Sequence, residues 1–139
     1  MDSRRYQAEL SVLNRKLAPN LFRFIDMDTD SPYVVIAART NQGNVYTLRI
    51  ELENFPQCIP PVYVLKQLYT KNGDPMPSYS GAMHTLECKN GWTQICHEGE
   101  SWTPNQSIYK VYIRCRLWLE LYEAHLKTGH PMDYYLKHD

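Results

Sequence analysis

Residues 84–104 read HTLECKNGWTQICHEGESWTP, and this stretch decides the fold that the sequence predicts. Cys96 follows the glycine-containing run 91–95, and Trp102-Thr103-Pro104 comes six residues after the cysteine. A long helical pattern begins directly afterwards. A loop of this kind keeps a sulfur atom accessible, while a well-anchored helix behind it fixes the loop in place. The arrangement suits a cysteine that forms a thioester, because accessible thiols react more readily than buried ones.

The helix after this stretch carries clear boundary signals. Thr103 is predicted to be its N-cap, Pro104 its first residue, and Gln106 completes a Thr-x-x-Gln capping box. Gly129 and Pro131 are expected to end it. Apolar residues at helical spacing form one stripe, at Ile108, Val111, Tyr112, Cys115, Leu119, Tyr122 and Leu126.

The residues before this stretch predict one helix and then a meander of four strands. Ser3 can cap the helix. Pro19 is expected to end it, because the residue before a proline is pushed out of helical geometry. Three prolines in residues 54–61 remove hydrogen-bond donors and exclude this corner from a central strand. One face of the predicted helix carries Tyr6, Leu10, Leu13 and Leu17. The predicted strands cover residues 21–27, 33–40, 46–52 and 62–68.

These elements predict an α+β fold in a single domain over residues 1–139. It consists of an N-terminal helix, a four-stranded antiparallel meander, a cysteine loop and a long C-terminal helix packed on the sheet. Residues 84–101 show little periodicity and are expected to be irregular. The tail, residues 132–139, is expected to form a short helix or to fray.

Composition limits the class of protein. Hydrophobic residues make up 43% of the chain, which is typical of a folded globule. Fifteen basic residues balance fifteen acidic ones, so no overall field favours nucleic acid or an anionic membrane as partner. No apolar run approaches the roughly 20 residues of a membrane span, and the first residues lack the apolar core of a secretion signal. The four cysteines are therefore expected to be reduced, in the cytoplasm.

Several motifs resemble ubiquitin-conjugating enzymes in their order and spacing. Asn54-Phe55-Pro56 with Pro60-Pro61 resembles the family's Tyr-Pro…Pro-Pro turn after the third strand, with one extra residue here. His84 stands twelve residues before Cys96, where the family has the histidine of its His-Pro-Asn motif. The resemblance implies the ubiquitin-conjugating fold and a thioester at Cys96.

The residues around the cysteine extend the resemblance and also depart from it. Ile95-Cys96 matches the Ile/Leu-Cys of the family's catalytic position, and Trp102-Thr103-Pro104 resembles the Trp-Ser-Pro that opens the next helix. Thr85-Leu86 replaces Pro-Asn, so the asparagine that helps to stabilise the oxyanion is missing there. Asn90 or a backbone N–H can take its place; loss of one such donor typically costs about 2.7–4 kcal/mol of transition-state stabilisation.

The closing helix resembles one branch of the family. Trp118-Leu119-Glu120-Leu121-Tyr122-Glu123 and Lys127-Thr128-Gly129 are similar to conjugating-type proteins of bacterial antiphage (CBASS) systems, which occur beside cGAS-like nucleotidyltransferases. That branch implies a protein substrate, the C-terminal tail of such a synthase, held through Cys96. An activating enzyme is an implied further partner, and neither nucleic acid nor membrane is expected. The family also implies that Arg4, Arg5, Arg15 and Lys16 lie where an activating enzyme or ligase docks.

The candidate catalytic residues are Cys96, His84, Asn90 and His97, with no cofactor and no metal. Either histidine can depress the pKa of the thiol or relay a proton, although each can equally be structural. Cys115 is expected to be a core residue and Cys58 a partly buried residue of the proline corner.

Three alternatives remain open. A zinc site would use the four donors His84, Cys88, Cys96 and His97. A redox-responsive protein would pair Cys88 with Cys96. A protein-binding module of the same fold, like the catalytically inactive variants and RWD-type relatives, would use neither thiol.

Overall fold

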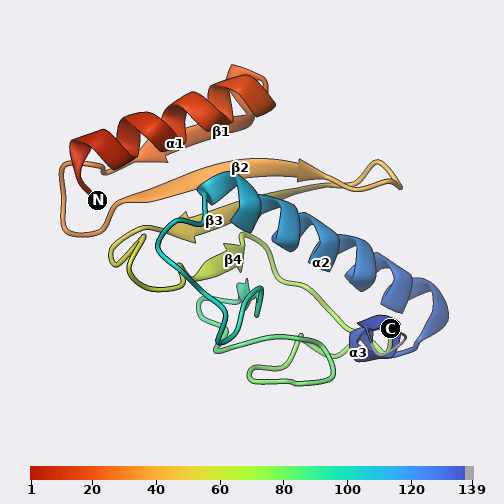
Figure 1. Ribbon diagram of the computed structural model, residues 1–139. Helices are drawn as coiled ribbons and strands as arrows, with labels where there is room; N and C mark the ends of the chain where they lie inside the picture. Colours follow the sequence, from red (N-terminus) through yellow and green to blue (C-terminus); the bar gives the residue numbers. More distant parts are fainter. Residues whose placement is uncertain (137–139) are drawn as a thin grey trace.

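The computed structural model of the protein describes residues 1–136, so the last part of the predicted tail lies outside the described residues. Figure 1 shows a long C-terminal helix laid across one face of an antiparallel sheet, with the N-terminal helix beside the first strand. The predicted α+β class is confirmed. The elements are α1 (Ser3–Lys16), a 3₁₀ turn (Pro19–Leu21), β1 (Phe22–Ile25), β2 (Tyr33–Arg39), β3 (Val45–Glu51), β4 (Val62–Val64), β5 (Thr93–Gln94), α2 (Ile108–Thr128) and α3 (Met132–Leu136).

The sheet has five strands in the order β1-β2-β3-β4-β5, one more than the sequence predicts. Its first four strands form the predicted meander, and β2 pairs with β3 along its whole length. The additional strand, β5, pairs with β4 through Gln94 opposite Tyr63 and Thr93 opposite Val64. Residues 84–101 were therefore wrongly predicted to be irregular throughout.

A two-residue hairpin explains why this strand forms. Lys89 and Trp92 exchange both backbone hydrogen bonds, at 3.1 and 2.7 Å. Between them, Asn90 and Gly91 have φ angles of 55° and 76°, in the left-handed region. Asn-Gly is the residue pair that tolerates positive φ at both central positions of such a turn. The hairpin returns the chain so that Leu86 N–H donates to the Gln94 carbonyl at 2.9 Å.

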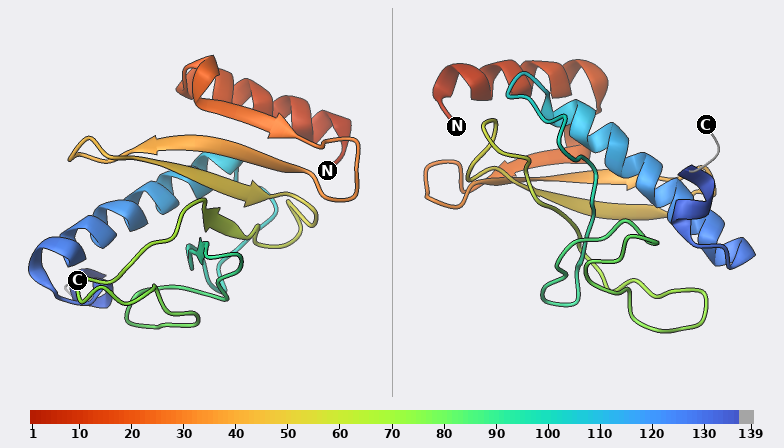
Figure 2. Two further views of the ribbon diagram at one scale, coloured as in Figure 1. Left: turned by 180° about the vertical axis from the view of Figure 1, so that it is seen from behind. Right: turned by 60° about the horizontal axis from the view of Figure 1, so that its bottom comes forward.

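The core lies between the sheet and α2. The faces of β2, β3 and β4 that point toward α2 carry buried apolar residues, and these pack against the apolar stripe of α2. Viewed from behind, the strands lie in front of both helices (Figure 2), so α1 and α2 cover the same side of the sheet. Completely buried members of this core are Val34, Ile36, Leu48, Ile50, Val62, Val111, Cys115 and Leu119. Each large apolar side chain buried in this way contributes about 1.5–3 kcal/mol relative to exposure.

The C-terminal ends of the helices match the prediction better than their N-terminal ends. Gly129 adopts φ 80° and its N–H donates to the His125 carbonyl, so α2 ends as expected. The N-cap of α2 is Ser107, whose side chain accepts from Lys110 N–H, and the predicted Thr103 cap is wrong. The N-cap of α1 is likewise Asp2, one residue before the expected Ser3.

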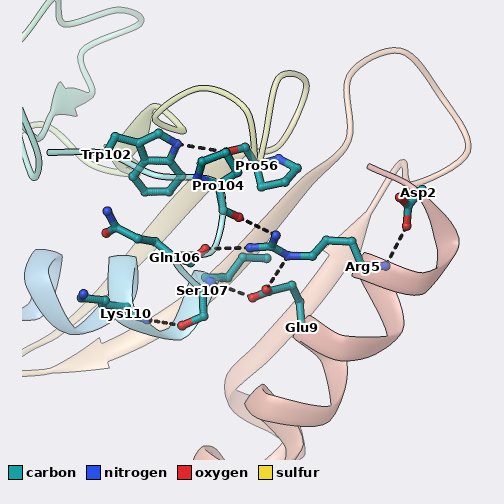
Figure 3. A network of polar contacts seen from close by, with 10 residues as sticks. Asp2, Arg5, Glu9, Pro56, Trp102, Pro104, Gln106, Ser107 and Lys110 are labelled. Atoms are coloured by element: carbon teal, nitrogen blue, oxygen red, sulfur yellow. Dashed lines mark hydrogen bonds and ion pairs between the residues drawn. The ribbon is translucent and has the colours of Figure 1, made fainter. Parts of the chain in front are cut away.

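The later start of α2 has a tertiary cause. Arg5 of α1 donates to the carbonyl oxygens of Pro104 at 2.6 Å and Gln106 at 2.8 Å (Figure 3), which holds residues 104–106 in a non-helical conformation. Glu9 of α1 accepts the N–H of Ile108 at 2.7 Å. The first turn of α2 is therefore positioned by α1, and a local capping box at Thr103 is not used.

Candidate active site

Cys96 continues the line of β5 toward the proline corner. Ile95 N–H donates to the Val62 carbonyl and Cys96 N–H to the His84 carbonyl, both at 2.9 Å, so successive residues bond to opposite neighbours. Side chains alternate along extended chain. Ile95 is buried in the core, which directs Cys96 to the other side. The Cys96 thiol is free and only partly buried.

His84 lies directly opposite Cys96. Thr85 and Ile95 form an antiparallel bridge, and His84–Cys96 is the next opposed pair. Its carbonyl also accepts the indole N–H of Trp118 at 3.0 Å. His84 has φ 52°, in the left-handed region that non-glycine residues rarely adopt. The imidazole Nε2 lies 3.1 Å from Asp133 Oδ1 on α3.

His97 turns away from the thiol and fastens the proline corner. Its Nε2 bonds the Pro60 carbonyl at 2.9 Å. Burial lowers the pKa of His97, and the bond to Pro60 opposes this effect only in part, so the ring is neutral at neutral pH. Its Nδ1 is buried and has no hydrogen-bond partner within residues 1–136. A pocket of about 140 Å³ adjoins the ring, between Pro60 and Ile95.

Asn90 is not brought to Cys96. It occupies the exposed hairpin turn before β5, whereas Cys96 lies beyond the end of that strand. Four residues of extended chain from Trp92 to Cys96 span about 13 Å. Turn formation explains why an asparagine stands at this position, because Asn90 has a left-handed φ and lies beside Gly91.

The zinc site and the Cys88–Cys96 disulfide both need side chains that converge, and the positions of these side chains do not support either alternative. Cys88 lies next to the hairpin turn, with its sulfur 3.8 Å from the Pro77 and Leu86 carbonyls, about four ladder positions away from Cys96. A disulfide requires Cα atoms within about 7 Å of each other. His84 and His97 bond to Asp133 and Pro60 respectively. In the described part of the chain, no group of three His, Cys, Asp or Glu residues is placed to hold a metal ion.

The remaining two cysteines differ from each other. Cys115 is completely buried on α2, as predicted, and burial raises the pKa of its thiol strongly. Cys58 is exposed, although the sequence predicted a partly buried corner residue. The proline residues around Cys58 pack into the corner while its own side chain faces solvent.

The segment between Cys96 and α2 is fastened at several points. Trp102 donates its indole N–H to the Pro56 carbonyl at 2.9 Å (Figure 3), which ties the segment to the proline corner. Gln106 donates to the Ser101 carbonyl and accepts from Arg114, at 3.2 and 2.9 Å. Closer to the thiol, Glu98 accepts from Gly99 N–H and Ser101 Oγ. These bonds lower the pKa of Glu98, so it carries a negative charge at neutral pH.

The basic residues that the resemblance assigned to a docking face differ in their contacts and exposure. The Arg5 guanidinium is engaged within the protein by Glu9, Pro104 and Gln106. Lys16 lies over the Tyr109 ring at 5.7 Å. Arg4 is exposed and lines a pocket of about 530 Å³ between α1 and the proline corner.

Two residues that support the cysteine segment were missed from sequence. Trp118 is 4% exposed and donates to the carbonyls of both Met83 and His84. Its place beside the apolar stripe of α2 is compatible with a position at the border of the core or in a docking surface, and does not indicate this bond. Asp133 bonds His84 through its carboxylate and Ala82 through its backbone N–H, at 3.1 and 2.8 Å. No local pattern in the sequence indicates this contact.

Comparison of the chain with protein-family models, with curated proteins and with solved structures gave no match. None of the helices within residues 1–136 is long and apolar enough to cross a membrane.

Proposed function

We propose that this chain has the ubiquitin-conjugating fold and carries an acyl group on Cys96. The C-terminal carboxyl of a protein substrate would form a thioester with the thiol and then pass to an amine or another nucleophile. Following the resemblance of α2, the substrate is the tail of a cGAS-like nucleotidyltransferase, in bacterial antiphage defence. An activating enzyme would supply the activated carboxyl.

One observation carries most of this proposal. Cys96 is a free, partly buried thiol whose backbone is bonded to His84 while its neighbour Ile95 is bonded to Val62. A sulfur held on a rigid backbone, and directed away from the core, suits a thiol that must meet a large acyl donor. The ties from Arg5 and Trp102 to the following segment keep its surroundings in place.

The missing asparagine favours a second candidate, a binding module of the same fold without catalysis. Thr85, the residue after His84, is buried, and its hydroxyl donates to the Pro77 carbonyl at 2.6 Å. Asn90 is in the distant turn. Neither residue supplies an oxyanion donor. That role would fall to a backbone N–H of this protein or to a residue of the substrate.

An adduct trap separates the two candidates. The wild type, Cys96→Ser and Cys88→Ser are expressed with the native neighbouring genes, and their intact masses are measured with and without a thiol reductant. A thioester predicts a mass gain that reductant removes, that persists in Cys88→Ser, and that becomes resistant in Cys96→Ser as an oxygen ester. Cys88→Ser is the matched control, because this partly buried thiol lies on the neighbouring segment. Partner binding without an adduct in any variant would favour the module.

A further inference from the structure

We propose that Asp133 is a positioning residue that orients His84 to accept the proton of the Cys96 thiol. The three side chains come from separate elements: Cys96 from the extension of β5, His84 from the opposed segment, and Asp133 from α3. This inference rests on the proposed role of Cys96 as the acyl-bearing nucleophile. It adds a function for α3, which the proposed function does not use.

The first step is the tautomer of His84. Its Nε2 lies 3.1 Å from the carboxylate of Asp133, so Nε2 carries the proton and donates. The lone pair of a neutral ring is then on Nδ1. A carboxylate bonded in this way also stabilises the imidazolium that forms when Nδ1 takes a proton. Asp133 thereby selects the tautomer in which Nδ1 can accept a proton.

The second step is the placement of the ring relative to the thiol. His84 and Cys96 are opposed in the ladder, and their backbones are joined by a 2.9 Å hydrogen bond. Opposed residues of an antiparallel ladder have Cα atoms about 5.5 Å apart, so the two side chains start from neighbouring positions. Within residues 1–136 the thiol and the ring are not hydrogen-bonded, so a side-chain rotation has to bring them together for the proton transfer. His84 holds its left-handed backbone because its carbonyl is bonded by both Cys96 and Trp118. Such strained positions are concentrated at functional sites.

The third step is the attachment of α3. Asp133 N–H donates to the Ala82 carbonyl at 2.8 Å, and Met132 is completely buried. Neither contact uses the carboxylate, so changing the Asp133 side chain leaves them in place. Asp133→Asn therefore leaves these two attachment points of α3 intact.

The proton transfer balances within a thioester exchange. The thiol proton moves from Cys96 to His84 Nδ1, which leaves a thiolate and an imidazolium. The thiolate attacks the carbonyl carbon of an incoming acyl thioester, a new C–S bond forms, and the old C–S bond breaks. The departing thiolate takes the proton from the imidazolium, which regenerates the neutral ring.

Within residues 1–136, the side chains on the elements around this pair are engaged as follows. Asp133 faces His84 from α3, while α2 presents the uncharged indole of Trp118 to the His84 carbonyl. On the extension of β5, His97 is bonded to Pro60 and Glu98 to Gly99 and Ser101. On the segment of His84 itself, Glu87 accepts from Tyr79.

Alkylation by iodoacetamide tests the inference without any acyl donor. Its rate at Cys96 is read by peptide mass spectrometry between about pH 5 and 9, with Cys88 as internal reference for an unassisted thiol. An imidazolium beside a thiol favours the reactive thiolate, so Cys96 should react at least about tenfold faster than Cys88 near pH 7. Asp133→Asn should remove most of this advantage and move the Cys96 profile to higher pH. Asp133→Glu should restore it in part.

Two comparisons make the test decisive. In a His84→Gln background, Asp133→Asn should have no further effect on the profile. Glu87→Gln, a carboxylate change on the same segment, should leave the profile unchanged. The inference is overturned if Cys96 and Cys88 titrate alike in the wild type, or if Asp133→Asn acts equally without His84. If Cys96 shows the expected fast alkylation, dependent on Asp133 and His84, but no adduct forms in the mass experiment, the Cys96–His84–Asp133 relay is retained and the acyl-carrier function is rejected.

Discussion

Glu9 of α1 accepts the backbone N–H of Ile108, the first residue of α2, at 2.7 Å. Its other carboxylate oxygen bonds Arg5 Nε at 2.8 Å (Figure 3), and the same arginine binds the carbonyls of Pro104 and Gln106. Glu9 is only 4% exposed. The N-terminal helix thus supplies an N-terminal hydrogen-bond acceptor for the C-terminal helix, from 99 residues away in the chain.

Replacement of Glu9 should therefore destabilise the whole protein. Glu9→Ala leaves Arg5 Nε and the Ile108 N–H without their partner, and breaking a buried pair in this way costs about 3–5 kcal/mol. Arg5 is partly exposed, so we expect the lower end, about 3 kcal/mol. Urea unfolding measures the change. Gln7→Ala, an exposed position on the same helix, is the control and should change stability by less than about 0.5 kcal/mol. Equal effects at the two positions would contradict the role of Glu9 of α1 as a cap for α2.

Because His97 is buried as a neutral ring, we expect the protein to lose stability in mild acid. Burial lowers its pKa in the folded state below the unfolded value of about 6.5. Between these two values the unfolded chain binds more protons, so stability is highest above about pH 6.5 and falls as pH drops toward the folded pKa. His97→Gln retains a donor for the Pro60 carbonyl but does not titrate. The unfolding free energy of this variant should be flatter than that of the wild type from about pH 7 to 5. An unchanged slope would show that His97 is not the group responsible.

The sequence predicted those elements whose cause is local. The alternation of Tyr46, Leu48 and Ile50 predicted β3, and Gly129 predicted the end of α2. The Asn90-Gly91 turn was also predictable, because Asn-Gly between β-forming residues is a strong hairpin signal. Treating residues 84–101 as one irregular loop concealed it, and led to Asn90 being considered as a catalytic donor.

Contacts between distant segments could not be predicted in this way. Ser107 caps α2, and Thr103 does not, because Arg5 and Glu9 hold residues 104–108 from another helix. His84 and Cys96 were singled out as candidates, and their opposition across the ladder follows from the hairpin. Asp133 carries no local signal, since only the folded chain places α3 beside His84.

Glu123, on α2, is expected to be a second acid-sensitive group besides His97. Its side chain accepts from Tyr46 OH at 2.7 Å and from Asn44 Nδ2 at 2.8 Å. Burial tends to raise the pKa of Glu123, but hydrogen bonds such as those from Tyr46 and Asn44 outweigh it, so the pKa is lowered. This stabilisation is present above the unfolded pKa of about 4.3 and is lost as pH falls through the folded value.

Glu123→Gln should remove that acid-dependent part of the stability. At neutral pH the variant should lose about 2 kcal/mol, because hydrogen bonds to a charged acceptor are replaced by weaker ones. Below about pH 4 its stability should approach that of the wild type. Thermal unfolding over this pH range measures both effects. Glu53→Gln, an exposed carboxylate, is the control and should follow the wild type throughout. A constant difference between Glu123→Gln and the wild type at every pH would contradict the assignment.

Trp118 should control the stability of the Cys96 segment. Its indole N–H donates to the carbonyls of Met83 and His84, at 3.2 and 3.0 Å, and its ring stacks on Tyr122. Trp118→Phe retains an aromatic ring but removes the donor and leaves a small cavity, so we expect a loss of about 2–3 kcal/mol. Because His84 then lacks one of the bonds that hold its left-handed backbone, the Cys96 amide should exchange with solvent markedly faster. Hydrogen exchange measured at Cys96 tests this, with Trp92→Phe on the hairpin as the control. Equal acceleration in both variants would show that the indole bond does not hold the segment in place.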